Sequence, residues 1–401
     1  MRAGFAAVAA VAAMALAAPG AGAATGAEIV SWINAMRTAH GIPPGIVENP
    51  AFSAACANHN TYALTNKSTP QEQLAHSEDP AKPGYTPEGD AAARRSVLYS
   101  DQRWTADNNP FEVAPLHLHQ LLEPRLDAMG ADDRQGYGCA STLWSLNRPD
   151  PPGNVTYTYP ANGAQRWSTD FVARELPFTP GEKVGIPQGT KTGPYLYVMF
   201  DGPGAFPHWA PGSKALSASL TGPEGPVPLT VVDNHTPGLQ NYLSIGPELI
   251  PRAPLRANST YTAAISALVP IADQTSPTGL KQVRYDHSWS FSTGPATAEL
   301  RRAIRPRLRG RLRGRRLTFT VPRAAVGHAG RVAVTLFSRG GRPDWRWTFI
   351  EQLRRKNTIR VPRRRGSRRY LGVRVFAGPF VAADGTRYPE SQKGRVYRAP
   401  R

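Results

Sequence analysis

Glycine and proline are the residues that most restrict how this chain can fold. The 401 residues include 37 Gly and 39 Pro. Glycine weakens the interior of a helix and proline breaks it, so this density favours short elements joined by turns. No repeat period accompanies these residues, which argues against collagen-like and long-helical architectures. We therefore expect a loop-rich chain with many β-strands, long enough for two or three domains.

The first residues predict export. Met1-Arg2 is a basic start, Ala6 to Ala18 is an apolar run, and Ala21-Gly22-Ala23 is a small-residue cleavage pattern. These three parts make up a secretory signal peptide, here residues 1–23. The run is shorter than the roughly 20 apolar residues that a membrane span needs. We expect a secreted protein, free or associated with the cell surface, without a transmembrane helix after cleavage.

The cysteines predict one disulfide. The chain has 2 Cys, Cys56 and Cys139. An even pair in an exported protein is typical of a disulfide, and the alternative is two buried free thiols. The bond would close a loop of about 80 residues, which corresponds to ~4 kcal/mol in the chain-entropy model.

Residues 24–150 contain the helical signals of the chain. A capping box, Thr25-x-x-Glu28, predicts one helix start, and proline at the first helical position predicts others at Asn49-Pro50, Thr86-Pro87 and Pro115. His59 lies on the apolar stripe of the second helix, where a hydrogen-bonded core histidine is the favoured interpretation over a ligand. His117 and His119 flank the apolar face of the last helix.

The rest of the chain predicts β domains. Short apolar runs separated by turns in residues 151–294 are typical of an immunoglobulin-like β-sandwich. Residues 295–316 are an Arg-rich linker, and residues 317–401 are a small basic β domain. The expected strands of the sandwich include residues 195–200, 227–232, 242–245, 259–265 and 287–293.

Positive charge is concentrated at the C-terminal end. The net charge is +19, and residues 295–401 alone hold 29 Lys and Arg against 5 Asp and Glu. Alternate positions in the linker are arginine, so an extended chain would place them on one side. This candidate anion-binding set consists of Arg307, Arg309, Arg311, Arg313 and Arg315. An anionic cell-wall polymer or a lipid surface is the expected partner, and nucleic acid is disfavoured because the chain is exported. The alternative is a solvated face without a partner.

Residues 27–146 resemble the CAP superfamily, the cysteine-rich secretory/antigen 5/pathogenesis-related domain in its bacterial form. The resemblance rests on the segments AMRTAHGIPPGIVENPAFSAACANHNTYAL, LAHSEDP, GYTPEGDAAARRSVLY, PLHLHQLLEPRLDAMGA and GYGCA. It implies an α/β/α sandwich. Together with the β domains this gives an α+β class: a CAP-like sandwich followed by two β-sandwich-type domains.

The same resemblance implies a cleft with two imidazoles and two acids. His76 and His117 would be the imidazoles and Glu88 the first acid, and such a set can bind Zn²⁺ or another divalent cation. Two departures concern this site: Pro87-Glu88-Gly89 replaces the family's Gly-Glu-Asn, and Glu112 and Asp107 are both candidates for the second acid. Glu88 could instead be a helix-start acid favoured by the dipole, and His76 a surface loop residue.

The functional expectation is binding or interaction. No G-x-S-x-G or H-E-x-x-H motif occurs, and the paired cysteines would leave no thiol nucleophile. We expect a secreted protein of the cell envelope or extracellular space with a ligand-binding role. It would bind a divalent cation in the cleft if the two imidazoles and two acids come together there. One alternative is a metal-assisted hydrolase of peptide or cell-wall material that uses His76, His117 and Glu88. Another is a lipid or sterol carrier.

Overall fold

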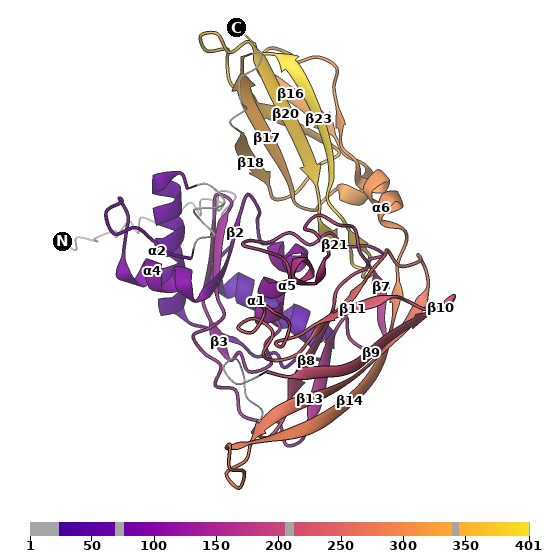
Figure 1. The fold of residues 1–401 in the computed structure, drawn as a ribbon. Coiled ribbons are helices and arrows are strands. Elements are labelled where there is room, and N and C mark those ends of the chain that lie inside the picture. Colours follow the sequence, from indigo (N-terminus) through magenta and orange to yellow (C-terminus); the bar gives the residue numbers. More distant parts are fainter. Residues whose placement is uncertain (1–23, 69–75, 205–211, 339–344, 401) are drawn as a thin grey trace, which may run out of the picture.

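The computed structural model describes residues 24–68, 76–204, 212–338 and 345–400. The predicted signal peptide, residues 1–23, lies outside the described residues. Figure 1 shows a helical N-terminal region beside a large β-sandwich, with a second β domain above them. None of the described helices is both long and apolar enough to cross a membrane.

The N-terminal region combines short helices with a small sheet. Its helices are α1 (Gly26–Ala39), α2 (Pro50–Asn66), α4 (Pro87–Arg94) and α5 (Pro115–Leu121), with a 3-10 turn at Pro110–Val113. Its antiparallel sheet has the order β2-β5-β4, with β2 (Ser96–Ser100), β5 (Tyr137–Ser141) and β4 (Ala131–Arg134). A short parallel pair is formed by β1 (Val47–Glu48) and β3 (Ala128–Met129).

The predicted helix starts are confirmed at atomic detail. The Thr25 hydroxyl accepts from the Glu28 N–H, and the Glu28 carboxylate accepts from the Thr25 N–H, which completes the capping box. Asn49 caps α2 with Pro50 at the first helical position, and Thr86 caps α4 in the same way. These caps satisfy helix-terminal N–H groups that would otherwise lack a partner.

Two sheets of the middle region form an immunoglobulin-like β-sandwich, as predicted. The first sheet is β11-β12-β8-β6, made of Leu229–Val232, Glu248–Pro251, Leu196–Asp201 and Val155–Tyr159. The second is β10-β9-β13-β14-β7, made of Gly225–Pro226, Lys214–Gly222, Thr260–Ala272, Leu280–Thr293 and Ala164–Trp167. A 3-10 turn lies at Pro180–Val184. Trp289 and Phe291 alternate with serines and both point into the core.

The C-terminal domain is also a two-sheet structure. After α6 (Thr297–Ile304), one sheet has the order β15-β16-β19, made of Arg307–Leu308, Arg316–Thr320 and Lys356–Arg360. The other is β18-β17-β20-β23, made of Arg346–Ile350, Gly330–Phe337, Tyr370–Ala377 and Ser391–Arg398. A 3-10 turn (Arg323–Ala325) and the pair β21 (Phe380–Val381) and β22 (Arg387–Tyr388) complete it.

The predicted α+β class with a leading α/β/α sandwich is wrong: the chain is mainly β. Strands make up most of the regular structure in the described residues. Two of the N-terminal helices, α4 and α5, have only 8 and 7 residues. The apolar side chains of this region join those of the β-sandwich in one continuous core that extends from Ala24 to Phe291. The C-terminal domain has its own core, which includes Phe319 and Val375. Helix-start patterns report only local structure, so they overstated the weight of the helical part.

Candidate functional site

The structure brings the two predicted imidazoles together. The rings of His76 and His117 stack with centroids 6.2 Å apart, and the rings of Phe111 and His117 stack with centroids 5.7 Å apart. Each imidazole has one nitrogen anchored: Nδ1 of His76 lies 2.7 Å from the Ala93 carbonyl, and Nδ1 of His117 lies 2.9 Å from Glu175 Oε2. Burial lowers the pKa of both imidazoles, that of His117 to about 4, so both are neutral at pH 7.

The acids expected beside them are elsewhere. Glu88 is exposed in the first turn of α4. Glu112 binds Arg387, and Asp107 binds His328 of the C-terminal domain. Among the described residues no group of three or more His, Cys, Asp or Glu side chains is arranged to hold a metal ion. As placed, His76, His117 and Glu88 do not form a group that fits a divalent cation. Metal binding by these three residues stays a prediction, which a metal titration tests.

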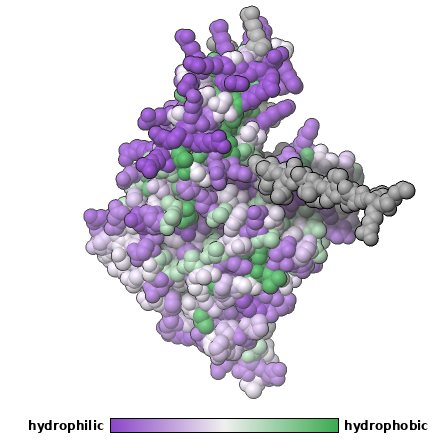
Figure 2. Space-filling model, turned by 180° about the vertical axis from the view of Figure 1, so that it is seen from behind, coloured by the Kyte–Doolittle hydropathy of each residue, from purple (hydrophilic) through white to green (hydrophobic). Residues whose placement is uncertain are grey.

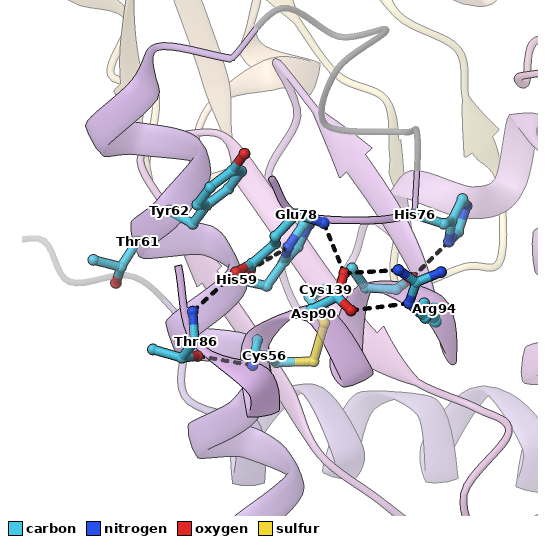
Figure 3. A network of polar contacts seen from close by, with 12 residues as sticks. Cys56, His59, Thr61, Tyr62, His76, Glu78, Thr86, Asp90, Arg94 and Cys139 are labelled. Carbon is cyan, nitrogen blue, oxygen red and sulfur yellow. Dashed lines mark hydrogen bonds and ion pairs between the residues drawn. A yellow bond between two sulfur atoms is a disulfide. The ribbon is translucent and has the colours of Figure 1, made fainter. Parts of the chain in front are cut away.

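A different acid serves the core histidine of α2. His59 is buried, and its Nδ1 lies 3.0 Å from Glu78 Oε1, as Figure 3 shows. The second oxygen of Glu78 accepts from the Thr86 N–H, and the Glu78 N–H donates to Asp90. His59 is therefore a core residue that is hydrogen-bonded through one ring nitrogen, Nδ1. Its other nitrogen, Nε2, is buried and has no hydrogen-bond partner among the described residues.

The predicted disulfide is confirmed. Cys56 of α2 and Cys139 of β5 are bonded, with a sequence separation of 83. Both side chains are fully buried in a small cluster with Ala92 and Leu98. The bond therefore joins the helical layer to the sheet beside the His59–Glu78 pair (Figure 3).

Helix α5 is tied to the β-sandwich by two buried histidine–glutamate pairs. His117 meets Glu175, which also accepts from the Leu116 N–H at 3.0 Å. His119 Nδ1 lies 3.3 Å from Glu248 of β12. Burial raises the pKa of both glutamates, so removal from water favours their uncharged forms. The two histidines point to different acids, as their 200° separation on a helix requires.

A cavity lies where the N-terminal region, the β-sandwich and the C-terminal domain meet. Its volume is about 770 Å³, and His117 forms part of its wall. Much of the lining is aromatic: Phe111, Tyr159, Trp167, Phe171, Tyr195 and Tyr197. We call it the junctional cavity. Size and lining both lie in the range of small-molecule sites, which measure roughly 300–1,000 Å³ and are mostly apolar.

One polar cluster fixes the C-terminal domain against this cavity. Arg387 of β22 donates to Glu112 at 3.0 Å and to the Tyr159 hydroxyl at 3.2 Å, while that hydroxyl donates to Glu112. The Arg387 guanidinium also lies 3.8 Å from the centre of the Trp167 ring. Burial lowers the pKa of Arg387, but Glu112 and Tyr159 together raise it by more, so the guanidinium stays charged and is neutralised inside the cluster.

The rim of the junctional cavity carries positive charge without such compensation. Arg301, Arg302 and Arg305 line it from α6 and the residue after it, and Arg174 lines it from a loop of the sandwich. All four are exposed, and among the described residues no acidic side chain pairs with them. The acids of the lining are engaged elsewhere: Glu390 with Arg331 and Asp170 with Lys191.

The predicted anion-binding arginines do not form one extended row. Only Arg307 belongs to a strand, β15, and Gly314 turns the chain with a φ of +56° before β16 begins. Arg307, Arg309, Arg311 and Arg313 are exposed, whereas Arg315 is half-buried and donates to the Val361 carbonyl. The positive charge therefore lies at the surface, but the turn prevents the arginines from lying along one side of an extended chain.

Sequence reasoning missed the residues that build this site. Glu175 is 58 positions from His117, and Arg387 is 275 positions from Glu112. Each is an isolated charge in a loop or short strand without a local motif. Only the tertiary fold makes them partners, so no spacing in the sequence could reveal them.

The comparisons with known proteins show no family for this chain. No family model matches the chain, and no curated protein matches it. Among solved structures, the chicken interferon gamma receptor alpha chain is 11% identical, covers 63% of this chain and 98% of its own, and has a TM-score of 0.19. A segment of two fibronectin type III domains from chicken tenascin is 13% identical over 51% of this chain and 92% of its own, with a TM-score of 0.17. The E. coli chaperone DraB is 11% identical over 60% and 96%, with a TM-score of 0.17.

At these TM-scores the likeness carries nothing about the assembly or activity of this chain. The assignment to the CAP superfamily is wrong: no family model supports it, and the chain is mainly β instead of an α/β/α sandwich. Its motifs were short, and Asn49-Pro50, Thr86-Pro87 and Pro115 are helix starts that any fold can use. The predictions of immunoglobulin-like β domains and of the disulfide are confirmed.

Proposed function

We propose that this protein binds a small anionic amphipathic molecule in the junctional cavity. The observation that carries the proposal is the pairing of aromatic walls with a rim of four arginines that have no acidic partner among the described residues. A guanidinium binds a carboxylate or a phosphate through two parallel hydrogen bonds. A ligand with such a headgroup and an apolar body would satisfy both parts of the cavity.

The interior favours binding over catalysis. Two charged groups inside the cavity, Arg387 and Glu112, already neutralise each other in an ion pair. His117 is oriented by Glu175, but within the described structure no hydroxyl or thiol is hydrogen-bonded to its ring. A nucleophile needs such contact with its base. The hydrolase alternative therefore has no observation in its favour, whereas carriage of a lipid-sized anion agrees with the cavity.

Export to an oxidising compartment and an anionic partner for the C-terminal domain belong to the same proposal. The buried Cys56–Cys139 disulfide supports an oxidising environment, because such bonds persist mainly in exported proteins. The exposed arginines of the C-terminal domain support attraction to an anionic cell-wall polymer or lipid surface. Figure 2 shows hydrophilic side chains spread over that domain.

The cavity is tested by calorimetric titration of the full chain with dodecyl phosphate below its micelle concentration. Dodecyl maltoside, with the same tail and no charge, is the ligand control. The variant Arg301→Gln/Arg302→Gln/Arg305→Gln is expected to weaken dodecyl phosphate at least about tenfold, since each charge-assisted hydrogen bond contributes ~1.5–3 kcal/mol. Arg363→Gln/Arg364→Gln/Arg365→Gln removes the same charge from a remote exposed loop and is expected to change the affinity less than about twofold. Equal losses in both variants, or equal binding of the maltoside, would refute a specific anion site.

A further inference from the structure

The C-terminal domain presents a second surface whose chemistry differs from that of the cavity. Side chains alternate across its sheet β18-β17-β20-β23, so one face packs on the core through Val332, Val334 and Val373. The other face carries aromatic side chains on three adjacent strands. They are Phe337, Trp347, Phe349, Tyr370 and Phe376, and Trp345, the residue before β18, lies beside Gly372 on the same face.

Arginines are interleaved with these rings. The Arg374 guanidinium lies 4.7 Å from the centre of the Trp345 ring, and that of Arg331 lies 4.9 Å from both Trp347 and Phe376. Such cation–π contacts hold the rings and the charges in fixed places. Arg374 is exposed, so its remaining N–H donors are open to a ligand.

The floor between the rings is flat because small residues occupy it. Ala333, Thr335 and Gly372 lie beneath, and a Cβ on Gly372 would come within 3.1 Å of both Thr335 and the Trp345 ring. The Thr335 hydroxyl is buried there and has no hydrogen-bond partner among the described residues. The lower end of the face is occupied by the N-terminal region, where Arg331 donates to the Asp101 carbonyl and Phe349 faces Arg103. In the upper part, the side chains of Trp347, Phe337 and Tyr370 are partly exposed in the part of the chain that the structure describes.

We infer that this upper part, the aromatic platform, binds an anionic polysaccharide. Partly exposed aromatic rings suit the apolar faces of sugar rings, and arginines suit the carboxylates of acidic sugars. Charge complementarity favours a polyanion, because residues 295–401 hold 29 basic and 5 acidic side chains. The inference rests on the proposed affinity of this domain for anionic partners and names both the surface and the ligand class.

Other polyanions fit less well. A lipid surface would require exposed aliphatic side chains, and Val396 is the large aliphatic residue that is exposed on this face in the described structure. Single-stranded nucleic acid also stacks on aromatic rings. The buried disulfide favours an oxidising compartment, where acidic polysaccharides and not nucleic acids are the common polymers.

The test uses the full chain and polygalacturonate, a polymer of uronic acid, in affinity electrophoresis and calorimetric titration. Trp345→Ala/Trp347→Ala is expected to weaken binding at least about tenfold, as the loss of stacking rings costs ~1–3 kcal/mol each in comparable sites. Trp347→Phe is expected to retain most of the affinity. Thr348→Ala lies on the same strand and on the opposite side, next to Val332, and serves as the matched control. Circular dichroism melting of each variant verifies that it is folded.

The outcomes separate this inference from the proposal beneath it. If polygalacturonate binds but the double tryptophan variant binds equally well, the platform is not the site and only this inference fails. If neither polygalacturonate nor dextran sulfate binds at low salt, the anionic partner fails as well. If oligo-dT of fifteen nucleotides binds more tightly than polygalacturonate and competes with it, the platform is a nucleic-acid site and the inference is overturned.

Discussion

The Glu112–Arg387 pair provides a sharp test of how the C-terminal domain is attached. The change is Glu112→Gln, which keeps the size of the side chain and removes the charge that neutralises Arg387. Their closest nitrogen and oxygen atoms are 3.0 Å apart, and the two side chains are 17% and 28% exposed. Glu112→Gln therefore leaves a guanidinium largely enclosed by Trp167 and Tyr159 without a counter-charge.

The magnitude follows from distance and burial. Two unit charges at 3.0 Å interact by about 5.5 kcal/mol at an effective dielectric constant of about 20. Removing one partner of a fully buried pair costs ~3–5 kcal/mol. Partial exposure lets water reach the guanidinium, so we expect about 2–3 kcal/mol here. Arg387→Met keeps an apolar stem over Trp167, and the double variant should recover at least half of the cost of Glu112→Gln, because no charge remains.

One amide reports on this interface directly. The Val381 N–H donates to the Asp107 carbonyl across it at 2.9 Å. A loss of 2–3 kcal/mol should speed hydrogen exchange of that amide by about 30- to 150-fold. The Val373 amide, within sheet β18-β17-β20-β23, should keep its rate. Glu224→Gln breaks an exposed pair, 63% and 80% accessible, and should have no effect at Val381. Exchange at Val381 that changes less than threefold, or costs that add up in the double variant, would refute the reasoning.

Three further predictions concern the rest of the molecule. Cys56→Ala/Cys139→Ala should lower the free energy of unfolding in urea by about 4–5 kcal/mol, because the loop it opens spans 83 positions; a loss below about 1 kcal/mol would contradict this. Burial lowers the pKa of His40 from 6.5 to about 3. The unfolded chain therefore takes up a proton near pH 6.5 that the folded chain refuses, and stability should fall by about 1.4 kcal/mol per pH unit below 6.5. His40→Asn should flatten that slope between pH 6.5 and 4.5, and an unchanged slope would assign it to other groups. Calorimetric titration with Zn²⁺ should show weak binding, since no acid among the described residues completes a metal-binding group with His76 and His117. A stoichiometric Zn²⁺ site that is lost in His76→Ala/His117→Ala would contradict this and support the metal site predicted from the sequence.

Local signals were sufficient for the helix starts and for much of the sandwich. The strands predicted at residues 259–265 and 287–293 exist, but they are longer, Thr260–Ala272 and Leu280–Thr293, and they pair with each other. The longer strand β13 includes Pro270, although proline cannot donate to a ladder. It is tolerated because β9 pairs with β13 only as far as Leu268, so Pro270 has a neighbour on one side alone.

One predicted strand, at residues 242–245, is wrong because the segment is buried without forming a strand. The apolar run at residues 242–245 predicted a strand, whereas the structure has turns there. Leu243 and Ile245 are nonetheless buried in the core of the sandwich. Apolar residues report that a segment is inside, and a short run cannot distinguish a buried strand from a buried turn.

The acids show why a motif could not predict the site. The resemblance assumed that the acids near His76 and His117 would lie in the same 120 residues, and it offered Glu88, Glu112 and Asp107. In the structure the acid of His117 is Glu175 from the sandwich, while Glu112 and Asp107 are turned toward the C-terminal domain. An acid that neutralises a buried arginine cannot also neutralise a cation, so as long as Arg387 is docked, Glu112 is not available to a metal. Detachment of the C-terminal domain in Glu112→Gln and the chemistry of the junctional cavity are thus linked through one carboxylate.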